Sequence, residues 1–177
     1  MWSISRFRRR GHAFALHRCR AALAAVFILA AGSAAIAVER MVLPVFALTA
    51  GDGAAVASDR LVRPGTWAFL YVSPQCLPCE SVLRSIDPAQ HPAFQRRLVV
   101  VVAGAGPAAV RDEAARYPGL ADAVWLGDAS NAIPRQIGHT GAPAIFGMRN
   151  DMIEWSVAGV LTDATDVQSI LANWLEK

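Results

Sequence analysis

The chain has 177 residues, of which 54% are hydrophobic and 18% are charged, and its formal net charge is +3. This composition excludes a disordered chain, which combines low hydrophobicity with high charge. Three cysteines are too few for a small scaffold held together by disulfides. The charge is unevenly distributed: residues 1–20 carry six arginines and no acid, whereas the rest of the chain carries eleven basic and fourteen acidic residues. The basic excess is therefore confined to the N-terminus, and we expect no nucleic-acid partner.

An uncharged apolar run, residues 21–38, directly follows the basic residues 1–20. As a helix it would be about 27 Å long, close to the thickness of the hydrocarbon core of a bilayer. The arginine-rich flank predicts a single-pass anchor in a bacterial inner membrane, with a cytoplasmic N-terminus and residues 39–177 in the periplasm. Ala35-Ile36-Ala37 also fits an A-x-A cleavage site, so a signal segment cleaved after Ala37 is the other interpretation. Both interpretations place residues 39–177 on the periplasmic side of the membrane.

Strands and helices alternate in the sequence of residues 39–177. The pattern predicts strands at 66–72, 97–103 and 123–126, and helices that end near 86, cover 107–117 and cover 131–137. Four consecutive valines in 97–103 indicate a central strand that is buried on both faces. Strands at 144–148 and 153–158 form a predicted hairpin, and a final helix covers 164–175 with Thr162 or Asp163 as its N-cap. This order is typical of a three-layer α/β domain.

The residues most suited to chemistry are Cys76-Leu77-Pro78-Cys79, where a predicted strand ends and a helix begins. Unpaired amide donors and the dipole at a helix N-terminus stabilise a thiolate. A spacing of two residues lets the second thiol reach the first, so that a disulfide can close and open. Pro78 suits the first helical turn, where its missing N–H is harmless. The motif therefore predicts a redox-active cysteine pair.

Three other interpretations of these cysteines fit the sequence less well. Half of a zinc site would need two more ligands, and residues 39–177 offer only His91 and His139, far apart in the sequence. A purely structural disulfide gains little from closing a two-residue loop. A peroxiredoxin would place Ser73 at the position of the threonine in Thr-x-x-Cys, but its usual arginine partner cannot be assigned. We therefore expect no bound metal.

Residues 43–177 resemble the thioredoxin-like superfamily, in particular its TlpA/ResA/MauD-type membrane-anchored branch. Leu43–Leu48 with the turn after it resembles the opening of that branch, and Phe69–Cys79 resembles its strand–C-x-P-C–helix core. The form Ser-Pro-x-Cys is closest to MauD, an accessory protein of methylamine dehydrogenase maturation. Gly141-Ala142-Pro143-Ala144 resembles the cis-proline loop of the family. The resemblance implies a thioredoxin fold, in which a central mixed sheet is flanked by helices.

The resemblance also implies an activity, protein thiol–disulfide exchange. Cys76 would be the exposed nucleophile, and Cys79 would be the buried thiol that resolves the mixed disulfide. A cis Pro143 and the Ala142 backbone, together with Pro78 and Leu77, would form the groove that receives the substrate. The implied partners are exported proteins with several cysteines, such as c-type cytochromes or a dehydrogenase subunit, and a membrane redox partner. No small-molecule cofactor is implied.

Three positions depart from the pattern of the family. Leu70 occupies a position at which the family often has a buried Asp, Gln75 replaces the usual aromatic residue, and Leu77 offers no side-chain hydrogen bond to a thiolate. The missing side-chain hydrogen bond at Leu77 disfavours a strongly oxidising centre, and the departures at Leu70 and Gln75 leave open a non-catalytic chaperone or assembly factor with a structural disulfide. We expect Glu80 to be a solvated acid of the first helical turn and His139 to be an exposed loop residue.

Overall fold

A computed structural model describes residues 40–139, 141–159 and 164–177. The expectations for residues 1–20 and 21–38, and the choice of Thr162 or Asp163 as N-cap, lie outside the described residues. Within the described part of the chain, no helix combines the length and the apolar character that crossing a membrane requires.

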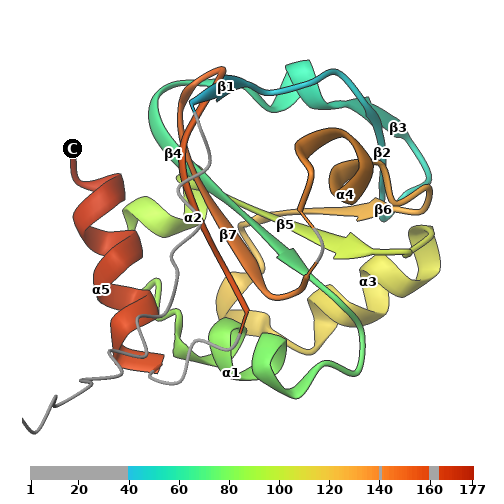
Figure 1. Cartoon of the computed structure of the whole chain (residues 1–177). Coiled ribbons are helices and arrows are strands. Elements are labelled where there is room, and N and C mark those ends of the chain that lie inside the picture. The colour runs from blue at the N-terminus through green and yellow to red at the C-terminus, as the bar shows by residue number, and fades with distance from the viewer. Residues whose placement is uncertain (1–39, 140, 160–163) are drawn as a thin grey trace, which may run out of the picture. The chain divides into compact units, whose positions relative to one another are not determined.

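An eight-stranded mixed sheet forms the centre of this domain, in the order β1-β8-β7-β4-β5-β6-β2-β3 (Figure 1). The three central strands β4, β5 and β6 are parallel, whereas β7, β8 and β1 on one side and β2 and β3 on the other side are antiparallel to their neighbours. The predicted mixed sheet is confirmed. Its strands are β1 (Met41–Val42), β2 (Ala47–Ala50), β3 (Ala55–Ala57), β4 (Arg63–Val72), β5 (Leu98–Ala103), β6 (Val124–Asp128), β7 (Ala144–Asn150) and β8 (Met152–Ala158).

Helices cover both faces of the sheet, which gives the predicted three layers. Side chains of α1, α2, α3 and α5 enter one buried cluster, and side chains of α4 enter the other. Both η segments are single 3₁₀ turns, one before β4 and one after α3. The helical elements are η1 (Ser58–Leu61), α1 (Leu77–Ser85), α2 (Ala93–Arg97), α3 (Pro107–Ala115), η2 (Pro118–Leu120), α4 (Ala132–Ile137) and α5 (Ala164–Leu175).

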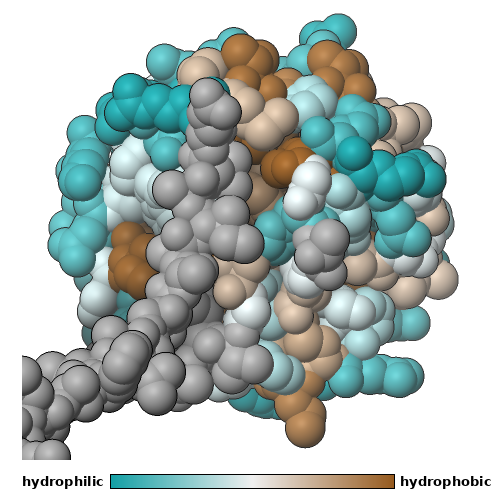
Figure 2. Space-filling view, viewed as in Figure 1, coloured by the Kyte–Doolittle hydropathy of each residue, from teal (hydrophilic) through white to brown (hydrophobic). Residues whose placement is uncertain are grey.

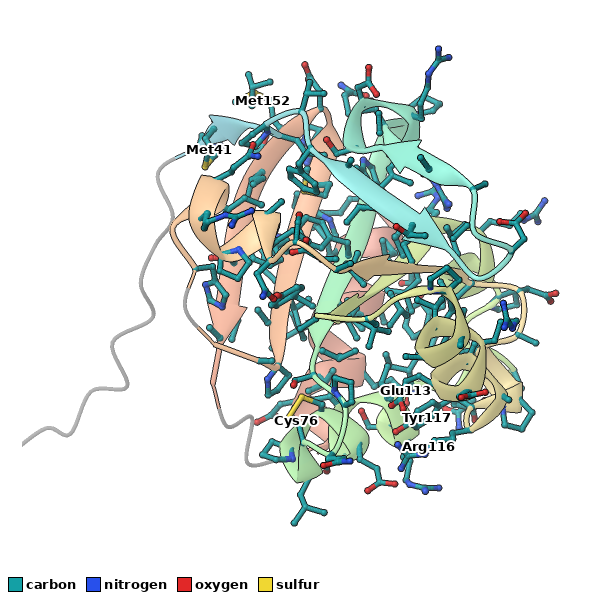
Figure 3. The ribbon with its side chains drawn as sticks, turned by 90° about the vertical axis from the view of Figure 1, so that its right-hand side faces the viewer. Met41, Cys76, Glu113, Arg116, Tyr117 and Met152 are labelled. Atoms are coloured by element: carbon teal, nitrogen blue, oxygen red, sulfur yellow. A yellow bond between two sulfur atoms is a disulfide. The ribbon has the colours of Figure 1, made fainter. Side chains whose placement is uncertain are left out.

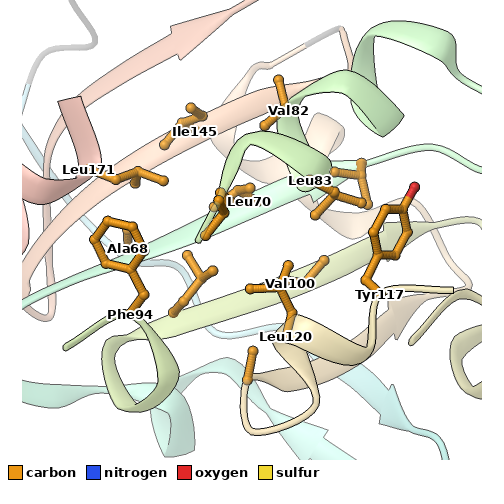
Figure 4. Packing of buried hydrophobic residues seen from close by; sticks show 14 of the residues in the cluster. Ala68, Leu70, Val82, Leu83, Phe94, Val100, Tyr117, Leu120, Ile145 and Leu171 are labelled. Carbon is orange, nitrogen blue, oxygen red and sulfur yellow. The ribbon is translucent and has the colours of Figure 1, made fainter. Parts of the chain in front are cut away.

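The two faces of β4 build the two halves of the core. Ala68, Leu70 and Val72 point to the cluster beneath α1 and α5, which Figure 4 shows from close by. Their neighbours along the strand alternate to the opposite face, as the period of two in a strand requires. Every residue from Leu98 to Val102 of β5 is at most 1% exposed, so the valine run is buried on both faces as predicted. The helix α1 therefore packs on a part of the sheet that is buried on both faces.

Several elements differ from those predicted. β4 begins at Arg63, three residues before the apolar run, because its first residues pair with the end of β7 around a register shift. The short helix α2 was not predicted. β6 continues through Gly127 and Asp128, which had been interpreted as the end of the strand. This position of the strand requires glycine, because a Cβ there would collide with the carbonyl oxygen of Ala105 in the neighbouring loop.

Candidate active site

A disulfide joins Cys76 and Cys79 where the loop after β4 enters α1 (Figure 3). Cys76 is the N-cap of α1, and its Sγ accepts a hydrogen bond from the backbone N–H of Cys79 at 3.2 Å. Pro78 occupies the first turn, where its missing N–H leaves no hydrogen bond unmade. The predicted placement of the motif at a helix N-terminus is confirmed. The amide donors there are positioned to stabilise a thiolate on Cys76.

The two cysteines differ sharply in their accessibility. Cys79 is only 2% exposed and lies in the core cluster beneath α1. Cys76 is partly exposed and packs against the edge of the same cluster. Leu77 between them is 78% exposed. An approaching thiolate can therefore reach the Sγ of Cys76 but not that of Cys79, which is the asymmetry the resemblance implied.

The loop before β7 lies beside the disulfide. The peptide bond between Ala142 and Pro143 is cis, as the resemblance implied. The carbonyl oxygen of Ala142 lies 3.9 Å from Cys76 Sγ, and the Pro143 side chain is buried. The sheet produces this juxtaposition, because Ala144 at the start of β7 pairs with Tyr71 near the end of β4. The structure thus brings together the residues assigned to a substrate groove.

The core beneath the cysteines contains no carboxylate at the position where the family often has one. Leu70 is 0% exposed and belongs to the same apolar cluster as Cys79. The backbone N–H of Ser73 lies 3.5 Å from Cys79 Sγ and is its polar neighbour among the described residues. A proton that leaves or reaches Cys79 must therefore exchange with water or with a group beside Cys76.

Glu80 is not the freely solvated acid that the sequence predicted. Its Oε1 lies 3.0 Å from the guanidinium of Arg84 and 2.8 Å from that of Arg116. Arg116 also binds Glu113 at 3.0 Å, so the cluster ties the end of α3 to the active-site helix. The hydrogen bond from Arg84, with the charge of Arg116, holds the pKa of Glu80 below its usual range. Glu80 is therefore an ionised member of an ion-pair network.

A small cleft connects this network to the reacting sulfur. Of the lining residues, the sequence pointed to Cys76 alone as a catalytic residue, and Glu80 was expected to be a solvated acid. Nothing in the sequence singles out Arg116 or Tyr117, because they follow α3 and lie far from the motif along the chain. The residues that line the cleft are Ser73, Gln75, Cys76, Glu80, Glu113, Arg116 and Tyr117.

His139 is partly buried, not the exposed loop residue that the sequence predicted. Its ring meets the ring of Phe146 edge-on, with 5.3 Å between the centroids. Its Nε2 is buried and has no hydrogen-bond partner among the described residues. Burial lowers the pKa of His139, so the neutral imidazole is the form that fits this place. His139 thus packs behind the cis-proline loop.

The chain was compared with protein families and with solved structures. No family model matches it, and no curated protein is similar to it at a significant level. A secreted disulfide oxidoreductase of Mycobacterium tuberculosis, homologous to E. coli DsbE, is 19% identical, with a TM-score of 0.55 over 72% of this chain and 95% of that one. A thiol:disulfide interchange protein of the thioredoxin family from Chlorobium tepidum is 16% identical, with a TM-score of 0.54 over 77% and 97%.

A thioredoxin-like protein of Porphyromonas gingivalis matches in the same way, with 15% identity and a TM-score of 0.56 over 76% of this chain and 92% of that one. At such identities the likeness establishes the fold. Residues 40–177 therefore have the thioredoxin-like fold that the resemblance implied. Their activity has to be argued from the site itself.

Proposed function

We propose that the protein is a thiol–disulfide oxidoreductase that exchanges disulfides with other proteins through Cys76 and Cys79. One observation carries the proposal: a disulfide at a helix N-terminus pairs an accessible sulfur with a buried one, beside the cis-proline loop. The accessible sulfur can form a bond to a partner, and the buried sulfur can then break that bond. The names of the similar solved structures support the same activity.

The exchange starts from either redox form of the site. A partner thiolate attacks Cys76 Sγ, the Cys76–Cys79 bond breaks, and Cys79 leaves with the electron pair and takes up a proton. A second partner thiolate then attacks the partner's sulfur of the mixed disulfide and releases the Cys76 thiolate. The partner has lost two electrons, and the cysteine pair has gained them. In the reverse direction, Cys76 attacks a partner disulfide and Cys79 releases the partner as a dithiol.

The groove around Cys76 can hold the partner chain during the exchange. The backbone of Ala142 next to Pro143 has a carbonyl oxygen close to Cys76 Sγ, where an extended segment can add main-chain hydrogen bonds. Leu77, the next residue along the chain, offers a large exposed apolar side chain, and Pro78 lies in the same first turn of α1. This arrangement suits a protein partner, because an extended protein chain can supply both the main-chain hydrogen bonds and the apolar contact.

We place this activity in the periplasm, with residues 21–38 as a membrane anchor or a cleaved signal segment. The apolar run ends at Val38, only a few residues before β1. Met41 lies at the opposite end of the domain from Cys76 (Figure 3). Val42 and Val45 are 57% and 66% exposed, and apolar residues stand out at the β1 end in Figure 2. An anchored domain would therefore rest this end on the membrane and direct the disulfide away from it.

The proposed partners are exported proteins with several cysteines and a membrane redox protein that renews the site. A role in the maturation of a cytochrome or a dehydrogenase, similar to that of MauD, follows from the Ser-Pro-x-Cys form alone. Mass analysis of the mature N-terminus distinguishes an anchor from a segment cleaved after Ala37. The reduction potential gives the direction of electron flow: about −270 mV indicates a reductant and about −120 mV an oxidant.

A trapping experiment tests the activity. In a Cys79→Ser variant of the full chain, the mixed disulfide on Cys76 cannot be resolved, so partner proteins accumulate as adducts that a reductant releases. The matched control is Cys76→Ser, in which the remaining cysteine of the pair is the buried Cys79. Adducts with Cys79→Ser and none with the control support the enzyme. If neither variant forms adducts while client proteins still mature, the protein is a non-catalytic chaperone with a structural disulfide.

A further inference from the structure

The hydroxyl of Tyr117 is a buried donor without a protein partner. Tyr117 is 5% exposed, and no group among the described residues exchanges a hydrogen bond with its hydroxyl oxygen. Leaving a buried hydroxyl unsatisfied is costly, and proteins of this size rarely do so without a reason. In Figure 4 the ring reaches from the end of α3 toward α1, with the hydroxyl at its far end. The donor therefore points to the active-site side of the domain.

Tyr117 lines the small cleft that also contains Cys76. The cleft has room for about one water molecule. A buried water also needs two or more polar partners. Tyr117 and Cys76 both line the cleft, and each carries a polar group: a hydroxyl and, once the disulfide is reduced, a thiolate. A water held in this cleft therefore has both residues on its walls.

The ring of Tyr117 is held firmly in this position. It stacks on Trp125 with 6.0 Å between the ring centroids. The guanidinium carbons of Arg84 and Arg116 lie 5.9 and 5.7 Å from the ring centroid. Burial, followed by the charge of Glu113, raises the pKa of Tyr117 and keeps its hydroxyl protonated. The group is therefore a fixed hydrogen-bond donor under the conditions in which a thiolate forms.

The charged residues around the cleft are paired with one another, so a further hydrogen-bond donor would help to stabilise a thiolate on Cys76. The acids Glu80 and Glu113 oppose a new negative charge on Cys76, but Arg84 and Arg116 hold both of them in ion pairs. Leu77 contributes no donor, and the amide of Cys79 contributes one hydrogen bond. A second donor from the cleft would favour the thiolate, because hydrogen bonds to a charged acceptor are roughly twice as strong as neutral ones.

We propose that Tyr117 is a positioning residue that stabilises the Cys76 thiolate of the reduced protein, by donating a hydrogen bond to one water that in turn donates to the sulfur. The inference rests on the proposed function and names a further residue of the same site. Two electrons and one proton convert the disulfide into a Cys76 thiolate and a Cys79 thiol. In the reduced protein the water bound to Tyr117 donates to the charged Cys76 thiolate. In the oxidised protein the sulfur of the disulfide is only a weak acceptor.

Replacing Tyr117 with phenylalanine tests this role, because the ring and its contacts stay while the donor is lost. Tyr71, the other tyrosine of the chain, provides the matched control Tyr71→Phe. It is 3% exposed and lies in the cluster on the opposite face of the sheet. The rate at which iodoacetamide alkylates reduced Cys76 is measured against pH for the wild type and both variants. The equilibrium of each protein with the glutathione couple is measured in parallel.

Tyr117→Phe should decrease the Cys76 thiolate fraction at acidic pH about ten- to a hundredfold, the amount expected for a lost hydrogen bond to a charged group. It should shift the glutathione equilibrium toward the disulfide in the same proportion. Tyr71→Phe should change neither value more than twofold. Urea unfolding should show that Tyr117→Phe destabilises the reduced protein more than the oxidised one, because only the reduced form offers the charged acceptor.

The proposal is overturned if the alkylation profiles of Tyr117→Phe and the wild type coincide. It is overturned equally if Tyr71→Phe shifts the profile as much, or if Tyr117→Phe destabilises both redox forms alike, because the hydroxyl would then act on the fold alone. The thiolate profile is a property of the folded protein without a partner. The result therefore stays separate from the trapping experiment, whose failure would end the proposed function instead.

Discussion

The carbonyl oxygen of Ala142 lies 3.9 Å from the Sγ of Cys76, although 66 residues separate them in the chain. The pairing of β4 with β7 fixes this distance, so it does not depend on the loop alone. A partner chain that pairs with the Ala142 backbone would carry its own cysteine directly to Cys76. On the free side of the sulfur it would meet Leu77, which is 78% exposed.

Leu77→Ser should therefore weaken the reaction with protein partners while leaving the reaction with small thiols intact. Burying a leucine side chain contributes about 1.5–3 kcal/mol, so kcat/KM toward a protein disulfide should fall roughly ten- to a hundredfold. The rate with glutathione, which is too small to cover Leu77, should stay within about twofold. An equal loss with both substrates would show that the substitution disturbs the cysteines and not the contact surface.

Glu80→Gln should make Cys76 more acidic. The substitution removes a negative charge from the cleft and releases Arg84 and Arg116 from their shared carboxylate, so the surroundings of Cys76 become more positive. The alkylation profile of Cys76 should shift to lower pH. Asp112→Asn is the control, because it removes an exposed acid from α3 that does not line the cleft. A shift to higher pH with Glu80→Gln would contradict the arrangement.

The sequence predicted the frame of this site well, because its signals are local. An apolar strand, the C-x-P-C motif and a helical period follow one another within residues 66–86, and β4 and α1 form there. The hairpin β7–β8 was predicted equally well, from two apolar segments and the turn between them. The cis peptide at Pro143 and its position beside Cys76 came from resemblance, and the structure confirms them.

What the sequence did not predict depends on contacts between distant segments. Glu80 is interpreted as solvated when only its own helix is considered, since its partner Arg116 lies 36 residues further along the chain. Tyr117 carries no motif, and its importance appears only when the end of α3 packs beside α1. Gly127 and Asp128 resemble a turn in sequence, yet the neighbouring loop requires a glycine within β6.

Asp128 should be essential for stability. It is 0% exposed, and its carboxylate accepts hydrogen bonds from the backbone N–H groups of Ala132 at 2.7 Å and Ile133 at 2.9 Å. These are first-turn donors of α4, and Asn131 at the N-cap makes no side-chain capping bond. Asp128→Ala should lower the free energy of unfolding by about 2–4 kcal/mol, because two buried donors lose their acceptor. Urea denaturation measures the loss, and Asp128→Asn should cost less because one acceptor remains.

Gly147→Ala should destabilise the domain without touching the active site. A Cβ at this position of β7 would overlap the indole of Trp155 on β8, so one of the two strands has to shift. Overpacking of this kind costs about 1–3 kcal/mol. Gly119→Ala is the matched control, because a Cβ there meets no atom within 4 Å, and it should change stability by less than about 0.5 kcal/mol. Equal effects in thermal unfolding would contradict the close contact.

His139 should make the domain less stable in mild acid. Burial lowers its pKa in the folded protein below the value near 6.5 of an unfolded chain, so the unfolded state takes up the proton first as the pH falls. Above about pH 6.5 both states are neutral and His139 has no effect on the pH dependence of stability. Below that pH, stability should decline until the folded protein is protonated as well.

A His139→Phe variant should show a flatter dependence of the unfolding free energy on pH between about 5 and 7 than the wild type. His91→Phe provides the control, because it removes an imidazole that packs against Phe94 and lies 3.4 Å from Glu176. That variant should retain the decline toward low pH. If His139→Phe and the wild type lose stability in parallel, the imidazole of His139 is not held neutral by its contact with Phe146.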